Sequence, residues 1–198
     1  MNKPFISAAD RNKGCILSHL ENLFSNSSKV LELGSGTGQH AVHFAKKLGH
    51  LTWQTSDLKH NLSGISAWIT DSHCQNLLEP IELDVRKWPS LTGRYDAIYS
   101  SNTIHYIEEK YVPTFFNESA NSLSVGGTFV LYGPFKLNGS YSSEGDLQLD
   151  LFLKQENEHY GLRDMNDLCA IALNSGMSLT EKIDLPANNK LIVWSKEK

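Results

Sequence analysis

The stretch KVLELGSGTGQH, residues 29–40, decides the fold of this chain. Residues 29–33 read as a buried strand, and a pattern typical of an amphipathic helix begins directly after the last glycine. Between strand and helix, glycines occupy alternate positions, at Gly34, Gly36 and Gly38. A glycine-rich turn lets the backbone approach a ligand closely, and the following helix directs unpaired N–H groups and a partial positive charge at it. The stretch therefore predicts a strand–turn–helix unit that binds a ligand.

The rest of the chain alternates between strand and helix patterns. After an N-terminal helix at 7–25, the expected elements up to residue 133 are strands at 51–57, 80–85, 95–101 and 126–133 and helices at 39–50, 60–72 and 110–123. Beyond it we expect a Gly- and Ser-rich loop at 133–145, a helix from 146 that ends before Gly161, a helix at 164–176, and strands at 177–185 and 190–195 joined by the hairpin PANN.

Such alternation predicts a parallel sheet with helices on both faces, and the closing hairpin makes the last strand antiparallel. We therefore expect a single α/β domain over 1–198 with a seven-stranded, mostly parallel Rossmann-like sheet. The loop-rich segment 133–163 is expected to form an insertion or lid.

Composition narrows the possible partners. The chain has 198 residues, 40% of them hydrophobic, which suits one domain with a sizeable core. The net charge is −4 and no segment is strongly basic, so a nucleic-acid partner is not expected. Cys15, Cys74 and Cys169 are odd in number and far apart, which argues against a disulfide framework. No apolar run reaches the roughly 18 residues of a membrane span and no signal peptide precedes the domain, which predicts a cytoplasmic protein.

The glycine spacing separates two kinds of ligand. A nicotinamide dinucleotide site prefers Gly-x-Gly-x-x-Gly, but the third glycine of that pattern would fall at Gln39. The alternating glycines, with Glu32 two residues ahead of them, resemble instead the first motif of S-adenosylmethionine-dependent methyltransferases. That resemblance implies that the cofactor contacts the following residues of the turn: Glu32, Gly34, Ser35, Gly36, Thr37, Gly38. A tight turn without a ligand is the alternative.

Polar residues at the ends of later strands support a nucleoside ligand. Asp57 ends the second expected strand, 19 residues after Gly38, where a carboxylate accepts hydrogen bonds from ribose hydroxyls. In methyltransferases an acidic residue at the end of the third strand lies beside the adenine amino group, and Asp84 with Val85 is placed for this role. Asn102, after the fourth strand, is expected near the methionine end of the cofactor. Each Asp is alternatively a loop carboxylate or a helix cap.

Several longer stretches together resemble an uncharacterised family of small methyltransferase-like proteins from bacteria and animals, known as a domain of unknown function. The matching stretches include DRNKGCIL, VLELGSGTGQHAVHFA, SSNTIHY, LYGPFK and PANN, and they extend from residue 10 to 189. The resemblance implies a class I methyltransferase fold and S-adenosyl-L-methionine as cofactor, but no particular substrate. The chain has QTSD where the family pattern has a proline before the serine, and SSEGDLQLD where it has Ser-Asn and Phe-Asp; both differences concern the substrate.

The fourth and fifth strands end in candidate catalytic residues. His105, in SSNTIHY, has a side chain whose ordinary pKa lies close to neutrality, so it is a candidate general base. Its alternative is a histidine that hydrogen-bonds a loop backbone. Tyr132 closes the fifth strand, and its phenol points either into the pocket or into the core.

Candidate substrate ligands come from three places. Arg11, Asn12 and Lys13 head the N-terminal helix, either covering the site or forming a solvated helix start. Arg163 is either an anion ligand or the partner of Asp164 in a salt-bridged cap. If Arg11, Lys13 and Arg163 converge, the acceptor is anionic. Asn188 and Asn189 are ordinary hairpin residues that only the family resemblance makes substrate candidates.

Metal-dependent and hydrolytic chemistry are disfavoured. His40 and His43 lie three residues apart on one helix, but no acidic or cysteine partner has matched spacing, so no metal is expected and His40 is assigned to capping the cofactor loop. The Gly-x-Ser-x-Gly elbow of serine hydrolases is missing. The leading interpretation is a methyltransferase acting on a small molecule. The alternatives are a non-catalytic protein that binds S-adenosylmethionine or S-adenosylhomocysteine and, third, a nicotinamide oxidoreductase.

Overall fold

A seven-stranded sheet with strand order β3-β2-β1-β4-β5-β7-β6 organises the protein, whose computed structural model describes residues 3–197. The strands are β1 Lys29–Leu33, β2 Thr52–Asp57, β3 Leu77–Glu82, β4 Tyr95–Ser101, β5 Leu123–Pro134, β6 Met177–Asp184 and β7 Asn189–Lys196. Strands β1 to β5 pair in parallel, and β7 runs antiparallel to both β5 and β6. The predicted α/β fold with an antiparallel last strand is confirmed.

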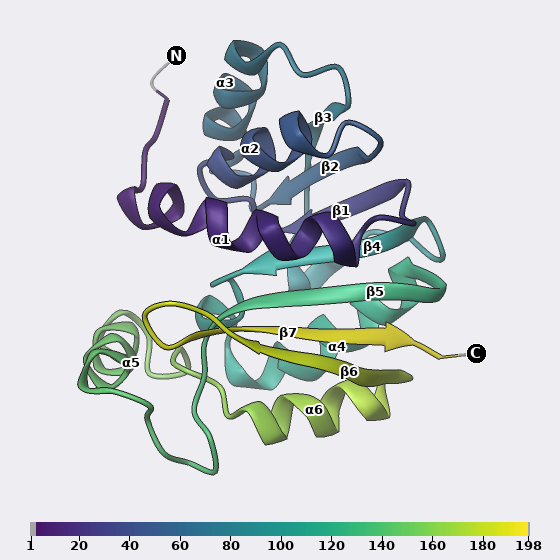
Figure 1. Cartoon of the computed structure of the whole chain (residues 1–198). Coiled ribbons are helices and arrows are strands. Elements are labelled where there is room, and N and C mark those ends of the chain that lie inside the picture. The colour runs from purple at the N-terminus through teal and green to yellow at the C-terminus, as the bar shows by residue number, and fades with distance from the viewer. Residues whose placement is uncertain (1–2, 198) are drawn as a thin grey trace.

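Helices cover both faces of this sheet (Figure 1). They are α1 Ser7–Leu23, α2 Gln39–Lys47, α3 Leu62–Ser72, α4 Val112–Ser122, α5 Glu144–Glu156 and α6 Met165–Asn174. The first three pack on one face around the fully buried Trp53, and α4 and α6 pack on the other around Trp194. None of the helices within residues 3–197 has the length and apolar character needed to cross a membrane.

The central strands are apolar on both faces, as a covered parallel sheet requires. In β1, Val30 belongs to the core beneath α1 and α2, whereas Leu31 belongs to the core beneath α4. In β4, Tyr99 and Ile98 divide between the same two cores. Side chains of successive residues alternate between the faces, so near-continuous hydrophobic runs satisfy both cores at once.

The carboxyl ends of the parallel strands meet at one edge of the sheet, on the left in Figure 1. The start of α1, the helix α5 and the turn between β6 and β7 lie on the same side. Helix α5 belongs to the connection between β5 and α6 and lies off the sheet faces. In open α/β sheets, ligands bind in the crevice outside this edge.

Strand β3 begins earlier than expected, at Leu77 rather than residue 80. The expectation treated Pro80 as the first residue of a strand, but Pro80 lies inside β3. Proline is tolerated there because β3 is an edge strand, where a missing N–H need not break a ladder on the open side. Strand β3 also ends earlier than expected, at Glu82 rather than residue 85. Asp84 therefore lies two residues beyond the strand and caps the 3-10 turn Val85–Lys87, with its carboxylate accepting from the Arg86 N–H.

Helix α5 ends at Glu156, short of the expected limit before Gly161. It begins at a Ser143 N-cap, whose hydroxyl accepts from the N–H of Asp146 at 3.1 Å.

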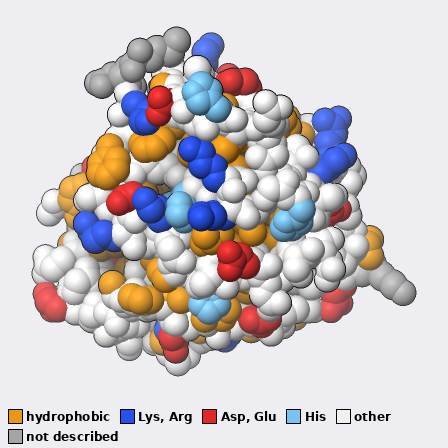
Figure 2. All heavy atoms as spheres, turned by 45° about the horizontal axis from the view of Figure 1, so that its top comes forward, with side chains coloured by type: hydrophobic (Ala, Val, Ile, Leu, Met, Phe, Trp, Pro, Cys, Tyr) orange, Lys and Arg blue, Asp and Glu red, His pale blue; other side chains and the backbone are white. Residues whose placement is uncertain are grey.

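On the face shown in Figure 2, Lys, Arg and His side chains are interspersed with acidic and uncharged ones.

Candidate functional site

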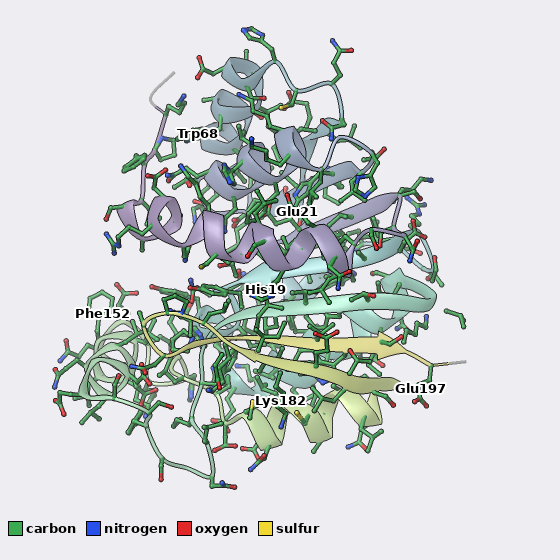
Figure 3. All side chains as sticks on the ribbon, in the orientation of Figure 1. His19, Glu21, Trp68, Phe152, Lys182 and Glu197 are labelled. Atoms are coloured by element: carbon green, nitrogen blue, oxygen red, sulfur yellow. The ribbon has the colours of Figure 1, made fainter. Side chains whose placement is uncertain are left out.

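A cavity of about 1130 Å³ occupies the carboxyl edge of the sheet. Its walls come from the β1–α2 turn, the ends of β2 and β4, the segment after β3, the start of α1, helix α5 and the β6–β7 turn. A labelled side chain of α5, the half-exposed Phe152, marks this helix at the edge of the molecule in Figure 3. The volume is ample for a nucleoside cofactor together with a small second ligand.

The three glycines of the turn all have the left-handed backbone that favours glycine, with φ of 72° at Gly34, 58° at Gly36 and 88° at Gly38. They serve different purposes. A Cβ on Gly34 would lie 2.2 Å from the hydroxyl oxygen of Thr103, and one on Gly38 would press on α3 at 3.3 Å from Ile65. A Cβ on Gly36 would meet no protein atom within 4 Å. Gly36 is therefore the position where bare backbone faces open cavity, whereas Gly38 caps α2 and does not line the cavity.

Glu32 places a buried carboxylate beneath this turn. Its Oε2 accepts from the Ser35 hydroxyl at 2.9 Å and from the Trp53 indole N–H at 3.2 Å. Burial raises the pKa of Glu32 to about 7 in spite of these two hydrogen bonds. Glu32, Ser35 and Thr37 all line the cavity, so a cationic ligand group at this position would favour the ionised carboxylate.

Asp57 holds the turn in place from the end of β2. One carboxylate oxygen accepts from the Gly36 N–H at 2.7 Å, and the other accepts from the N–H of Leu58 at 2.7 Å and the amide of Asn61 at 2.8 Å. Asp57 and Asn61 both line the cavity. Asn61 is not among the predicted site residues, although its position four residues after Asp57, at the start of a helix, was a usable signal.

Asp84 and Val85 also line the cavity. The guanidinium of Arg86 pairs with Asp84, with Nη2 at 2.6 Å from Oδ2, and this hydrogen bond holds the pKa of Asp84 below its usual range. The Arg86 side chain is 57% exposed, so the pair is a surface one and contributes little to stability.

His40 connects the cofactor turn to α1. Its Nε2 lies 2.7 Å from Asn12 Oδ1 and 3.1 Å from the Ala9 carbonyl, and its Nδ1 lies 3.3 Å from the Tyr99 hydroxyl. Because a carbonyl can only accept, Nε2 carries the proton and Nδ1 accepts from Tyr99. Burial lowers the pKa of His40 to about 4, so the ring is neutral at pH 7.

Asn102 and His105 lie after β4, where the chain bends over the cavity. Asn102 has a φ of 56°, a left-handed backbone that non-glycine residues rarely adopt, and its N–H donates to the Tyr132 carbonyl at 2.9 Å. The ring of His105 is 1% exposed and packs on Phe135, and neither ring nitrogen has a hydrogen-bond partner in residues 3–197. Burial, assisted by the charge of Arg163, lowers the pKa of His105 to about 3.

Tyr132 does not line the cavity. It lies in the core beneath α1, in the same cluster as Tyr99, and burial raises its pKa. Of the two predicted positions for the Tyr132 phenol, pocket or core, the structure has the core. Strand β5 presents Tyr132 and Val130 to one face and Leu131 to the other, as the period of two demands.

The condition for an anionic acceptor, that Arg11, Lys13 and Arg163 converge on the site, is not met, since none of the three lines the cavity. Arg11 donates to the Ser7 hydroxyl and Lys13 pairs with Asp10 along α1. Arg163 donates to the carbonyls of Ile107 and His159.

Asp164, the proposed partner of Arg163, and the three candidate asparagines have different positions. Asp164 caps α6 by accepting from the Asn166 N–H at 2.8 Å and makes no salt bridge with Arg163 in the described structure. Asn12, Asn188 and Asn189 do line the cavity.

The contribution of α5 and of several aromatic side chains to the cavity was not predicted. Lining side chains outside the predicted set include Trp88, Tyr106, Glu108, Tyr111, Asp146, Leu149, Leu153, Glu156 and Tyr160. A serine three residues before an acidic residue, Ser143 and Asp146, signals a helix start, but sequence spacing alone does not tell which turn of that helix faces a cavity. The described residues contain no group of three or more His, Cys, Asp or Glu side chains placed to hold a metal ion.

Several solved structures share this architecture, and three of them are named as methyltransferases. An O-methyltransferase family protein from Burkholderia thailandensis aligns with a TM-score of 0.83 at 15% identity, over 97% of this chain and 58% of that chain. Mitomycin 7-O-methyltransferase MmcR aligns with a TM-score of 0.83 at 13% identity, over 96% and 54%. Human N-acetylserotonin methyltransferase in complex with SAM aligns with a TM-score of 0.77 at 15% identity, over 96% and 53%.

At such identities the likeness establishes a methyltransferase-like fold, and the chain spans just over half the length of these proteins. The sequence comparison is more specific, because residues 3–196 match a single family model, described as "Protein of unknown function (DUF938)". With nearly its whole described length matched, the chain belongs to the DUF938 family.

Proposed function

We propose that this protein is an S-adenosylmethionine-dependent methyltransferase that acts on a small-molecule acceptor. The observation that carries the proposal is the open backbone at Gly36, which faces the same cavity as the carboxylates of Glu32, Asp57 and Asp84. The methyltransferase-like fold supports it, as does the SAM complex of the human neighbour.

The chemistry of the cavity fits the cofactor. Glu32 is a buried acid whose ionised form needs a cationic partner, and the ammonium of the methionine end supplies one. Asp57 would accept from ribose hydroxyls, and Asp84 and Val85 would lie beside the adenine; all three line the cavity. A side chain at Gly36 would take up space that the ligand needs. When bound, S-adenosylmethionine would supply a methyl group activated by a positively charged sulfur.

Methyl transfer is an in-line displacement, in which the protein aligns the reactants and excludes water. Helix α5 and the start of α1 would cover the acceptor, and the segment 133–163 would act as the lid. His105, which is neutral and whose two buried ring nitrogens have no partner in residues 3–197, would accept a hydrogen bond from the nucleophilic group of a bound acceptor. Asn102 would hold the methionine end near the ends of β4 and β5.

One experiment tests activity directly. The protein is incubated with methyl-labelled S-adenosylmethionine and a metabolite extract, and labelled products are sought by mass spectrometry. The proposal expects a labelled small molecule that is missing with heat-treated protein. His105→Ala should lower the rate of labelling more than it lowers the affinity for S-adenosylhomocysteine.

A second candidate is a non-catalytic protein that binds S-adenosylmethionine or S-adenosylhomocysteine. The observation that favours it is the burial of His105, whose ring nitrogens are both shielded from solvent; this burial lowers the pKa of His105 to about 3 and makes the imidazole a weak base. Binding of S-adenosylhomocysteine without any labelled product across a range of extracts would select this candidate over the methyltransferase.

A further inference from the structure

Helix α5 carries two buried aspartates one turn apart, Asp146 and Asp150, with exposed fractions of 5% and 0%. Buried carboxylates are rare unless donors surround them, because burial removes the water that stabilises their charge. The two residues differ in how this requirement is met.

Asp150 has a complete set of partners. Oδ2 accepts from the Tyr141 hydroxyl and from Lys154 Nζ, both at 2.7 Å, and Oδ1 accepts from the Leu162 N–H at 2.6 Å. These contacts tie α5 to the segments that precede and follow it. The role of Asp150 is therefore structural, and it needs no ligand.

Asp146 lacks such partners. It lines the cavity, and its Oδ2 is shielded from solvent yet has no hydrogen-bond donor in the described part of the chain. A buried carboxylate oxygen without a donor is costly to the folded protein. A donor from a bound ligand would remove this cost.

The surroundings favour a cationic ligand. Glu156 lines the same cavity, as does Glu108, which pairs with Lys110 at 2.8 Å. The one Lys or Arg among the described lining residues is Arg86, which Asp84 already pairs. Tyr106 and Tyr160 also line the cavity, with ring centroids 5.9 Å apart. Aromatic faces attract cations and pack on apolar groups.

We propose that the methyl acceptor is a small molecule that carries a positively charged amino group on an apolar or aromatic body, and that Asp146 binds this amino group. The inference rests on the proposed function, since it names the acceptor of the same site. A cationic acceptor is the opposite of the anionic acceptor that a convergence of Arg11, Lys13 and Arg163 would have implied. Glu32, Asp57 and Asp84 already serve the cofactor, whereas Asp146 belongs to the connection after β5, on the acceptor side.

The test uses small molecules matched in shape and different in charge. A panel of amines is compared with carboxylate and uncharged counterparts, as in the set tyramine, 4-hydroxyphenylacetate and 4-ethylphenol. Binding is measured by ligand-observed NMR with and without S-adenosylhomocysteine. At least some amines should bind about 10-fold or more tightly than their counterparts, the size of effect expected for a charge-assisted hydrogen bond.

Two variants decide whether Asp146 is responsible. Asp146→Asn should abolish the preference for amines and leave the melting temperature unchanged or higher. Asp150→Asn should keep the preference and lower the melting temperature. The proposal is overturned if no amine binds, if the counterparts bind equally well, if Asp146→Asn keeps the preference, or if Asp146→Asn is destabilised as strongly as Asp150→Asn.

Calorimetry with S-adenosylhomocysteine separates this inference from the proposed function. Equal affinities of wild type and Asp146→Asn, combined with no amine preference, would reject the cationic acceptor alone. No binding to wild type would reject the proposed function itself.

Discussion

Asp57 combines a structural task with a proposed binding task. Its carboxylate braces the Gly36 N–H and is the proposed acceptor for the ribose hydroxyls. Asp57→Asn keeps an oxygen acceptor but removes the charge, so the affinity for S-adenosylhomocysteine should fall about 10-fold. Isothermal titration calorimetry measures this change.

Asp96 offers a matched control at the opposite edge of the sheet, where it accepts from Ser28 and from the Lys29 N–H. Asp96→Asn should leave the affinity for S-adenosylhomocysteine unchanged. Equal affinities for wild type and Asp57→Asn would reject the ribose assignment.

Glu32 makes stability depend on pH. Its pKa is about 7 in the folded protein against 4.5 in the ordinary case. Between these values the unfolded chain has lost a proton that the folded protein keeps, so stability falls as pH rises from about 4.5 to about 7. The loss amounts to roughly 3 kcal/mol above pH 7.

Glu32→Gln removes this penalty. The variant should melt at a higher temperature than wild type at pH 8, and the difference should vanish toward pH 4.5. Differential scanning calorimetry across this range checks the sign. The same variant should bind S-adenosylhomocysteine more weakly, because the ammonium loses its anionic partner. Parallel melting curves at every pH would show that Glu32 is ionised in the folded protein.

Individual site residues were predictable where the backbone pattern determines their position. Glu32, Gly36 and Asp57 follow from strand ends and glycine spacing, and all three line the cavity. Tyr132 and Arg163 were not predictable in this way. The side of the sheet that Tyr132 faces depends on the register of β5, and the partners of Arg163 include a carbonyl 56 positions away in the chain.

Helix α1 is held against the cofactor turn by contacts from the start of α2. The Gln39 side chain accepts from the Ile6 N–H at 2.6 Å, and His40 donates to Asn12 and Ala9. Asn12→Ala should therefore cost about 1 kcal/mol, which lowers the melting temperature by about 2–4 °C for a chain of this size.

The control for this change lies on the same helix. Asn22 is exposed, and its side chain has no hydrogen bond among the described residues. Asn22→Ala should leave the melting temperature nearly unchanged. If both variants melt alike in thermal denaturation followed by circular dichroism, the contact between Asn12 and His40 contributes nothing to stability.

Element boundaries were least predictable where long-range pairing overrides local signals. The pattern placed β4 at its observed limits, 95–101, because β4 is central and apolar on both faces. It placed β3 three residues late, because a proline inside a strand is acceptable only at an edge, and the sequence does not reveal which strand is the edge.

The arrangement of layers followed from the alternation of strands and helices, but the composition of the cavity did not. Widely separated segments supply its walls, among them the β1–α2 turn, the start of α1, helix α5 and the β6–β7 turn. Only their assembly reveals that the cavity is lined by several acidic and aromatic side chains and by few basic ones.

The central claim is that this cavity encloses an adenosyl cofactor against the open backbone of Gly36. Gly36→Ala adds a methyl group into the cavity, and Gly139→Ala is its matched control, because Gly139 also has a positive φ and free space but lies outside the cavity. Both variants carry the same backbone strain of about 1 kcal/mol.

The most direct measurement is a calorimetric titration of wild type and these two variants with S-adenosylhomocysteine, alongside NADH. We predict saturable binding of S-adenosylhomocysteine to wild type and Gly139→Ala, much weaker binding to Gly36→Ala, and no binding of NADH. Absence of binding to wild type at about 1 mM S-adenosylhomocysteine, or equal affinities for all three proteins, would contradict the account.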